Sequence, residues 1–268
     1  MPTVLITGAS TGIGQATAEL FLERGWNVVA TMRTPKATRQ DPRWLCTALD
    51  VTDEASIQAA LAAAVARFGG VDVLVNNAGY GLSGTFESMS EAQLRRQFET
   101  NVFGLMRVSR ALIPHFRSRR SGVLINIGSM GGRLTFPFYS VYHATKWAVD
   151  GFTESLAFEL EPLGIRAKVV EPGAIKTDFY ERSAEFVHDR ALTEYNALVD
   201  TGMRRMKKAG AKGAPARAVA ETIWAAATDG SARLRYVVGQ DAKGLLGLRR
   251  LIGGDRLYRR MIAGQLLK

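Results

Sequence analysis

Three side chains with complementary acid–base chemistry lie in the stretch from residue 127 to residue 146: the hydroxyl of Ser129, the phenol of Tyr142 and the amine of Lys146. Tyr142 and Lys146 are four residues apart, so a helix through them places both on one face, one turn apart. A free phenol has a pKa of roughly 10 and exchanges protons poorly at neutral pH. A neighbouring lysine cation favours the phenolate and brings the pKa of the phenol nearer to the working pH. Ser129 follows an apolar run and could hydrogen-bond the oxygen that Tyr142 protonates.

A tyrosine and a lysine at this spacing are also an ordinary contact on many helix surfaces. Tyr139 is a second phenol nearby, but the residue four positions later is His143, so Tyr139 has no amine partner at that spacing. The catalytic interpretation of Tyr142 and Lys146 therefore depends on the elements that the rest of the chain supplies.

The composition is that of an ordinary globular protein, because 47% of the 268 residues are hydrophobic and 22% are charged. No apolar run approaches the roughly 20 residues that span a membrane, and no basic leader precedes the first apolar run. The single cysteine, Cys46, cannot form an internal disulfide and is expected to pack in the core. We therefore expect a cytoplasmic protein with no metal site.

The net charge of +10 is concentrated near the C-terminus. Residues 1–200 carry 20 Lys and Arg against 21 Asp and Glu, a net of −1, and residues 201–268 carry 15 against 4, a net of +11. This distribution argues against nucleic-acid binding by the main fold. The basic segment is either a solvated cationic face or a surface that attracts an anionic substrate or carrier, such as an acyl thioester.

The first element of the chain predicts an anion site. An apolar strand, 3–7, leads into T-G-A-S-T-G-I-G and then into a helical pattern that ends at Gly25. Glycines at 8, 12 and 14 let the backbone approach a pyrophosphate, and the helix start supplies N–H groups and a favourable dipole. The alternative is a tight turn without a ligand. The residues expected to contact a dinucleotide here are Gly8, Ser10, Thr11, Gly12, Ile13 and Gly14.

The end of the second strand, 27–32, indicates which dinucleotide is bound. Folds of this kind usually place an acidic residue there to bind the ribose hydroxyl of NAD. Here the chain reads Thr31, Met32, Arg33, and Arg33 could pair with the 2′-phosphate of NADP. Arg33 could equally be a solvated loop cation.

Polar and small residues follow the remaining strands in the same way. Asp50 and Val51 follow strand 45–49, the run 76–79 (N-N-A-G) follows strand 71–75, and Pro172 follows strand 165–170. Alternating strands and helices predict a doubly wound α/β fold, with about seven parallel strands and helices on both faces. Ligands bind such sheets at the carboxyl ends of the strands, where all these residues fall.

Two segments extend beyond this repeating pattern. Residues 176–213 form an insert of the kind that serves as a lid or substrate-binding segment, with helix-like pieces at 185–198 and then a basic run that contains glycines. Residues 244–268 predict two short amphipathic helices with a break at Gly253-Gly254, which pack on this domain or a partner subunit in preference to a membrane surface. We expect one domain, 1–243, with residues 244–268 as its basic extension.

These motifs in order make the chain resemble the short-chain dehydrogenase/reductase family, in its compact single-domain branch. The resemblance covers residues 3 to about 239. It rests on T-G-A-S-T-G-I-G, D-V at 50–51, N-N-A-G, Asn101, Ser129, Y-H-A-T-K and P-G-A-I-K-T.

The resemblance implies a role for each matching residue. Tyr142 is implied as general acid in reduction and base in oxidation, Lys146 as the group that tunes it and holds the nicotinamide ribose, and Ser129 as the partner of the substrate oxygen. Asn101 is implied to position a water that relays protons through Lys146. Hydride would then pass between the nicotinamide and the substrate carbon. The remaining implied cofactor contacts are Asp50, Val51, Asn77, Ala78, Gly79, Pro172, Gly173, Ile175 and Thr177.

One departure from the family pattern concerns the cofactor. Members that use NADP often have a basic residue before the second glycine of the first motif, where this chain has Thr11, so only Arg33 supports NADP. The run A-T-M-R-T at 30–34 resembles hydroxysteroid-, retinol- or carbonyl-reducing members and suggests a hydrophobic substrate.

The function expected from these observations is an NADP(H)-preferring oxidoreductase for a secondary alcohol/ketone pair. The alternatives are an NAD-dependent enzyme for a similar substrate and a dinucleotide-binding sensor or scaffold without catalysis. By analogy with the family, the chain is expected to form a homodimer or homotetramer.

Overall fold

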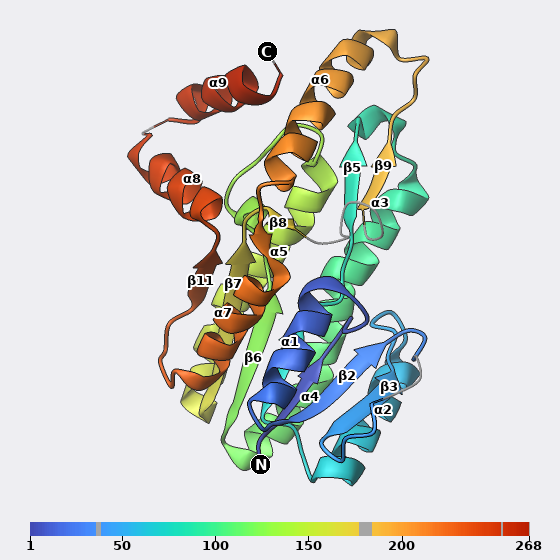
Figure 1. Ribbon diagram of the computed structural model, residues 1–268, viewed down its shortest axis with the longest axis vertical. Helices are drawn as coiled ribbons and strands as arrows, with labels where there is room; N and C mark the ends of the chain where they lie inside the picture. The colour runs from blue at the N-terminus through green and yellow to red at the C-terminus, as the bar shows by residue number, and fades with distance from the viewer. Residues whose placement is uncertain (36–38, 177–183, 253, 268) are drawn as a thin grey trace.

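The centre of the computed structural model is a seven-stranded sheet in the order β11-β7-β6-β4-β1-β2-β3, in which every neighbouring pair is parallel (Figure 1). The structure describes residues 1–35, 39–176, 184–252 and 254–267. The doubly wound sheet predicted from the alternating pattern is confirmed. Its strands are β1 (Thr3–Ile6), β2 (Asn27–Met32), β3 (Trp44–Ala48), β4 (Val73–Asn76), β6 (Gly122–Ile127), β7 (Ile165–Pro172) and β11 (Arg235–Val238).

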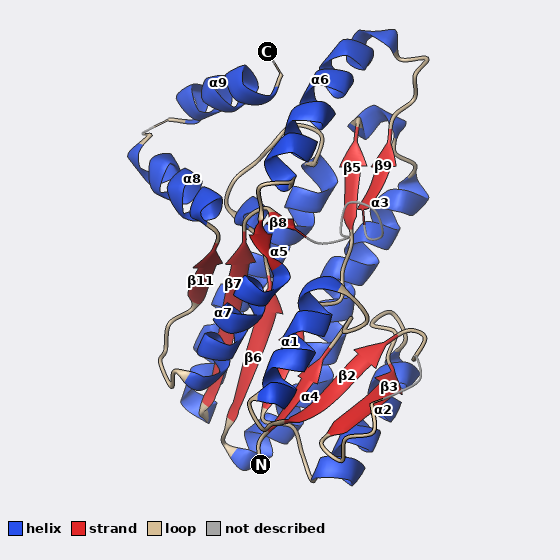
Figure 2. Ribbon diagram, in the orientation of Figure 1, coloured by secondary structure: helices blue, strands red, loops and turns tan. Residues whose placement is uncertain are grey.

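Helices cover both faces of this sheet (Figure 2). On one face, α1 (Gly12–Glu23) and α7 (Ala216–Thr228) pack side by side against the central strands. On the other face lie α2 (Glu54–Phe68), α4 (Leu105–Arg119) and α5 (Ser140–Leu160). The order of the strands places β4 beside β1, so successive crossovers run outward in opposite directions from this pair, which is where such sheets bind ligands.

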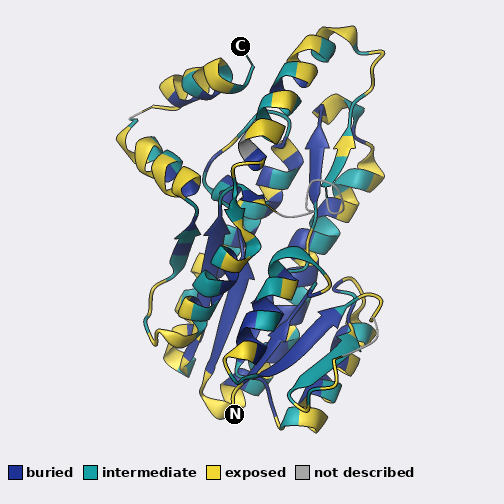
Figure 3. Ribbon diagram, viewed as in Figure 1, coloured by how far each residue is buried: buried dark blue, intermediate teal, exposed yellow. Residues whose placement is uncertain are grey.

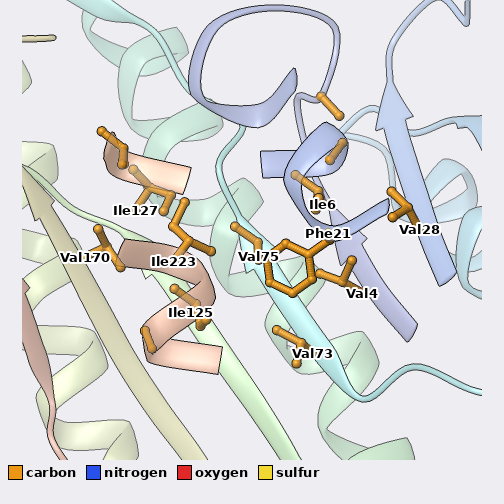
Figure 4. Close-up of a cluster of buried hydrophobic side chains, with 14 of the residues drawn as sticks. Val4, Ile6, Phe21, Val28, Val73, Val75, Ile125, Ile127, Val170 and Ile223 are labelled. Carbon is orange, nitrogen blue, oxygen red and sulfur yellow. The ribbon is translucent and has the colours of Figure 1, made fainter. Parts of the chain in front are cut away.

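The central strands are mostly apolar because both faces of the sheet are covered, although β7 also carries the buried charged residues Lys168 and Glu171, and Figure 3 shows these strands buried in the centre of the molecule. Figure 4 shows the layer under α1 and α7, where Phe21 is fully buried in a cluster with valines and isoleucines from β1, β2, β4, β6 and β7. Phe21 also meets the rings of Trp26 and Trp224 edge to face, with centroids 5.1 and 4.9 Å away. Burying a side chain of this size contributes roughly 1.5–3 kcal/mol to stability.

Local signals fix the ends of the helices near the site. The Asp53 side chain accepts from the Ala55 N–H and caps α2, and Gly69 ends this helix in the left-handed region at φ 78°. Ser90 and Gln93 form a capping box at the start of α3 (Glu91–Phe98). The buried face of α2 is formed by Ile57, Ala60, Leu61 and Ala64, whereas Val65 is 43% exposed.

The interruption predicted near Asn101 is confirmed as a turn of π-helix, η2 (Glu99–Gly104), between α3 and α4. Such turns often occur at functional sites, because the extra residue changes the direction of a side chain. Three short 3₁₀ turns complete this part of the chain: η1 (Phe86–Ser88), η3 (Met130–Gly132) and η4 (Glu161–Leu163).

The insert above the sheet differs in detail from the sequence prediction. Residues 184–187 form strand β9 (Ala184–Val187), which pairs with β5 (Gly81–Gly84), so the helix predicted from 185 is wrong in its first part. Most of the basic run that contains glycines, up to residue 210, lies within α6 (Thr193–Gly210). A second small sheet joins β8 (Ile175–Lys176) to β10 (Ala214–Pro215).

The two predicted C-terminal helices are α8 (Gln240–Leu251) and α9 (Asp255–Leu266). They pack on their own chain, because Leu246, Tyr258 and Ile262 form a cluster with Leu134. The boundary proposed at 243/244 falls within α8. No helix in the part of the chain that the structure describes is long and apolar enough to cross a membrane.

Candidate active site

A cavity of about 1280 Å³ at the carboxyl ends of the strands collects most of the residues singled out from the sequence. Gly14 and Asn101 lie behind its wall, and Thr177 falls outside the described residues. The predicted site residues that line the cavity are Gly8, Ser10, Thr11, Gly12, Ile13, Arg33, Asp50, Val51, Asn77, Ala78, Gly79, Ser129, Tyr142, Lys146, Pro172, Gly173 and Ile175.

The glycine-rich turn between β1 and α1 is held by the segment after β4. The Asn77 Nδ2 donates to the carbonyl oxygens of Thr7 and Gly8 over 2.9 and 3.0 Å. In return, the Thr7 Oγ1 accepts from the backbone N–H groups of Asn77 and Ala78, each over 3.0 Å. These four bonds hold the turn at the N-terminus of α1, where N–H groups without intrahelical acceptors attract an anion.

Two glycines of the turn are required for different reasons. Gly8 has a φ of 68°, and a Cβ there would lie 2.9 Å from the Ala78 Cα. Gly14 lies inside the first turn of α1, where a Cβ would lie 2.3 Å from the Gly8 carbonyl oxygen. Gly14 therefore allows the helix to approach the turn, and the cofactor contact expected of Gly14 from the sequence stays a prediction.

Tyr142 and Lys146 share one face of α5, as their spacing predicts. The Lys146 Nζ is 5.8 Å from the centre of the Tyr142 ring and donates to the Ile127 carbonyl oxygen over 2.8 Å. Ile127 ends β6, two residues before Ser129, so this bond ties the amine to the strand that carries the hydroxyl. Burial lowers the pKa of Lys146 to about 8, which leaves the amine mostly protonated at neutral pH.

A buried histidine shapes the loop that follows Ser129. The Phe136 N–H donates to the His143 Nε2 over 3.0 Å, so His143 carries its proton on Nδ1, which donates to the Gly131 carbonyl oxygen over 2.9 Å. Burial lowers the pKa of His143 to about 4. The Ser129 Oγ accepts from the Gly131 N–H over 3.0 Å. The neutral imidazole thus holds the loop that orients the Ser129 hydroxyl, a role that its position after Tyr142 did not suggest.

Asn101 is buried in the π-helical turn and acts on the backbone beside the cavity. The Asn101 Nδ2 donates to the Tyr80 carbonyl oxygen over 2.8 Å, and its Oδ1 accepts from the Tyr80 N–H over 3.0 Å. The buried amide predicted to need partners finds them in the residue that follows the N-N-A-G segment. The water-positioning role implied by the family resemblance stays a prediction.

The end of the cavity beside β2 and β3 carries Arg33 and Asp50. Arg33 is exposed at the end of β2 and lines the cavity, as the sequence suggested. Burial acts to raise the pKa of Asp50, but hydrogen bonds from the N–H and hydroxyl of Thr52, together with the charge of Arg33, hold it below its ordinary value. Asp50 is therefore a charged acceptor at neutral pH.

The end of β7 rests on a buried charge cluster behind α5. Glu171 is 1% exposed, and burial raises its pKa to about 7, although the Arg133 guanidinium 3.3 Å away acts in the opposite direction. The neighbouring Asp150 raises the pKa of Glu171 further. The Arg235 guanidinium forms ion pairs with both carboxyl groups, at 2.7 Å from Asp150 and 3.7 Å from Glu171. This cluster anchors the strand that leads into Pro172.

Sequence reasoning did not single out several residues that complete the site. Asp241, in the first turn of α8, accepts from the Ala174 N–H over 2.8 Å and supports the segment after Pro172. An acidic residue in the first turn of a helix was the available signal. The insert and the C-terminal helices contribute a further group to the cavity: Met206, Lys212, Leu245, Ile262, Gln265 and Leu266.

Comparison with known proteins supports the assignment suggested by this geometry. The family model for short chain dehydrogenases matches residues 2–187. An uncharacterized oxidoreductase of Schizosaccharomyces pombe is 38% identical over 215 residues, which cover 78% of this chain and 88% of the relative.

Solved structures show the same fold over nearly the whole chain. A short-chain dehydrogenase from Streptomyces avermitilis has a TM-score of 0.83 and 38% identity, and covers 93% of this chain and 94% of its own. ElxO with NADP bound has a TM-score of 0.72 and 28% identity, with coverages of 88% and 97%. A 3-ketoacyl-(acyl-carrier-protein) reductase from Brucella melitensis, solved with NADH, has a TM-score of 0.73 and 26% identity, with coverages of 88% and 96%. The chain is therefore a member of the short-chain dehydrogenase/reductase family and an NAD(P)-dependent oxidoreductase.

Proposed function

We propose that this protein interconverts a hydrophobic ketone and the corresponding secondary alcohol, with Tyr142 as proton donor and acceptor and with a preference for NADP(H). The observation that carries the proposal is the pairing of Tyr142 and Lys146 on α5, within the cavity that also contains the glycine-rich turn. A sensor or scaffold without catalysis would not need a phenol beside a buried amine.

The residues at the adenosine and phosphate end fit a dinucleotide. Gly8 lets the turn pack closely on the backbone of Ala78, and the turn leads into the start of α1, where N–H groups without intrahelical acceptors suit a pyrophosphate. Asp50, Asn77 and Gly173 line the path from there to Tyr142. When bound, the nicotinamide supplies or accepts the hydride, and the chain supplies orientation and proton transfer.

Proton transfer belongs to Tyr142, because its phenol is beside the amine of Lys146. The ammonium favours the phenolate and so lowers the free energy needed to pass the phenol proton to a carbonyl oxygen. The Ile127 carbonyl oxygen fixes the position of that amine. Ser129, held by its bond from the Gly131 N–H, retains a hydroxyl proton to donate to the same substrate oxygen.

Arg33 is the basis of the preference for NADP. It lines the cavity at the end of β2, where no acidic residue is available to bind a ribose hydroxyl. A guanidinium forms strong charge-assisted bonds with phosphate oxygens. ElxO binds NADP and the Brucella melitensis reductase binds NADH, so the comparisons are compatible with either cofactor.

A homodimer or homotetramer is part of the proposal. Three aromatic side chains on η2 and α5 are exposed: Phe103 at 50%, Trp147 at 52% and Phe158 at 76%. Exposed aromatic groups of this size favour contact with another copy of the chain.

The proposed reaction is tested by NADPH-dependent reduction of a panel of ketones with wild type, Tyr142→Phe and Tyr139→Phe. We expect Tyr142→Phe to lower kcat by about 10²- to 10⁴-fold, because general acid catalysis contributes that much. Tyr139→Phe is the matched control, since this neighbouring phenol also lines the cavity but has histidine four residues later. Equal rates for wild type and Tyr142→Phe would overturn the mechanism.

A further inference from the structure

The cavity continues beyond Tyr142 into a region built by the insert and the C-terminal helices. Four apolar side chains from these elements line it, in addition to the polar side chains of Lys212 and Gln265. We name the four apolar residues the C-terminal wall: Met206 from α6, Leu245 from α8, and Ile262 and Leu266 from α9. Ile262 is 5% exposed, and the other three are half-buried. The wall is apolar, and it belongs to the same cavity as the proposed catalytic residues.

The C-terminal wall packs against the loop that follows Ser129. Ile262 belongs to one hydrophobic cluster with Leu134 and Tyr258, and Met130, Phe136 and Leu266 pack against that cluster. The Tyr258 hydroxyl donates to the Thr135 carbonyl oxygen over 3.2 Å. Because this loop begins at the Ser129 hydroxyl, α9 is joined to the catalytic part of the site.

One arginine fastens α9 to the insert. The Arg205 Nη1, on α6, donates to the Gln265 carbonyl oxygen over 2.7 Å and to the Gly264 carbonyl oxygen over 3.5 Å. Carbonyl groups in the last turn of a helix have no partner within the helix, so a cation there satisfies them and complements the helix dipole. Arg205 thus holds the end of α9, including Leu266, in position beside Met206.

The charge surplus of this segment lies outside the cavity. Of the lysines and arginines in the described part of residues 201–267, Lys212 alone lines the cavity. Arg205 bonds α9, and Arg249 pairs with Asp255 across the connection between α8 and α9 while its guanidinium lies 4.8 Å from the centre of the Tyr258 ring. The surface of the segment is cationic, whereas the C-terminal wall is apolar, with Lys212 and Gln265 as polar residues elsewhere in the lining of the cavity.

We infer that the C-terminal wall is a substrate-specificity subsite, which binds an extended alkyl group carried by the ketone or alcohol. This inference rests on the proposed function and adds the substrate class. Burial of apolar surface is favourable and scales with area, so each methylene laid against Met206, Leu245, Ile262 and Leu266 adds affinity. The reacting carbonyl then lies at Tyr142, while the alkyl group extends toward α9.

The inference is tested with a series of 2-alkanones from 2-butanone to 2-dodecanone and NADPH. For wild type, we expect kcat/KM to rise about 3- to 4-fold with each added methylene until the wall is covered. Leu266→Asn and Leu245→Asn should lower the ratio of kcat/KM for 2-dodecanone to kcat/KM for 2-butanone by roughly 10-fold. The matched control is Leu257→Asn, because Leu257 is on α9 but is 59% exposed and does not line the cavity.

A second pair of variants tests the fastening of α9. Arg205→Gln should flatten the dependence on chain length, because it releases the end of α9. Arg204→Gln is its control, since the Arg204 side chain bonds Thr201 on the same helix. A readout without turnover is the melting temperature, which 2-dodecanone should raise in wild type and in Leu257→Asn, but less in Leu266→Asn.

The outcomes separate the inference from the proposed function. If wild type reduces 2-alkanones but its kcat/KM does not depend on chain length, or if Leu257→Asn behaves as Leu266→Asn does, the subsite is wrong and the reaction stands. If wild type reduces no ketone with either NADPH or NADH, the proposed function fails. A rise in melting temperature with 2-dodecanone that is lost in Leu266→Asn would still support the apolar subsite.

Discussion

The side-chain amide of Asn101 bonds both the N–H and the carbonyl group of Tyr80, over 3.0 and 2.8 Å. Asn101 lies in the π-helical turn between α3 and α4, and Tyr80 follows the N-N-A-G segment beside the cavity. The pair therefore links the helical layer to the wall of the cavity, whether or not Asn101 also positions a water.

We predict that Asn101→Leu lowers the free energy of unfolding by about 2 kcal/mol, because it leaves the Tyr80 N–H without its acceptor. Gln97→Met is the comparison: Gln97 donates only to the Tyr80 carbonyl oxygen, which keeps its bond from Asn101. Urea unfolding measures both values. Equal losses of unfolding free energy in the two variants would show that the pair of hydrogen bonds from Asn101 to Tyr80 has no special role.

We predict that Arg33→Asp lowers kcat/KM for NADPH about 10- to 100-fold and does not lower it for NADH, because a charge-assisted bond to the 2′-phosphate is lost and a repulsion is added. Steady-state kinetics with both dinucleotides measures the ratio. Arg39→Asp controls for the change in net charge, since Arg39 does not line the cavity. An unchanged ratio in Arg33→Asp would exclude this basis for NADP preference.

We predict that, because of His143, the free energy of unfolding decreases as the pH is lowered from about 6.5 to about 4. The pKa of His143 is lowered to about 4 by burial, so in this range the unfolded chain binds a proton that the folded chain does not. The stabilisation by neutral His143 is fully present above about pH 6.5. At pH 5 about 2 kcal/mol of it is lost.

The measurement for His143 is the difference between the unfolding free energies at pH 7 and pH 5, in wild type and in His143→Gln. The difference should shrink by about 2 kcal/mol in the variant. Glu171 acts in the opposite sense, because its pKa is raised to about 7, so only the comparison of variants isolates the histidine. His115→Gln serves as the control histidine substitution, and the same shrinkage there would count against the assignment.

We predict that Asp229→Ala costs about 3 kcal/mol of stability, because it leaves the buried Lys168 cation without its carboxylate. Lys168 is 1% exposed, and its Nζ lies 2.7 Å from Asp229, with further bonds to the Ala226 carbonyl oxygen and the Tyr236 hydroxyl. The pair formed by Arg190 and Asp200 has the same separation, 2.7 Å, but its side chains are 61% and 55% exposed. Asp200→Ala should therefore cost less than about 1 kcal/mol, and comparable losses would show that burial is not the deciding difference.

The sequence predicted the sheet and the catalytic edge because both depend on local patterns. Strand ends could be located from apolar runs, and all such ends of a parallel sheet lie on one edge, so Asp50, Asn77, Ser129 and Pro172 could be grouped before the structure was known. The pairing of Tyr142 with Lys146 followed from helix geometry alone.

The C-terminal wall could not be predicted in this way, because an amphipathic pattern shows that a helix has an apolar face but not what that face meets. The segment around Gly202 illustrates the difficulty. Gly202 lies within α6, and glycine is needed there because a Cβ would be 2.6 Å from the ring of Phe138. Such close approaches between distant segments leave no periodic signal in the sequence.

The bonds from Asn77 to Thr7 and Gly8 have a consequence for how the protein folds. They join residues some seventy positions apart, so the glycine-rich turn is completed only after β4 has paired with β1. Closing so long a loop costs conformational entropy before the stabilising contacts form, and this slows folding. The recovery of dinucleotide affinity during refolding should therefore follow the pairing of the two halves of the sheet, and its rate reports when that pairing occurs.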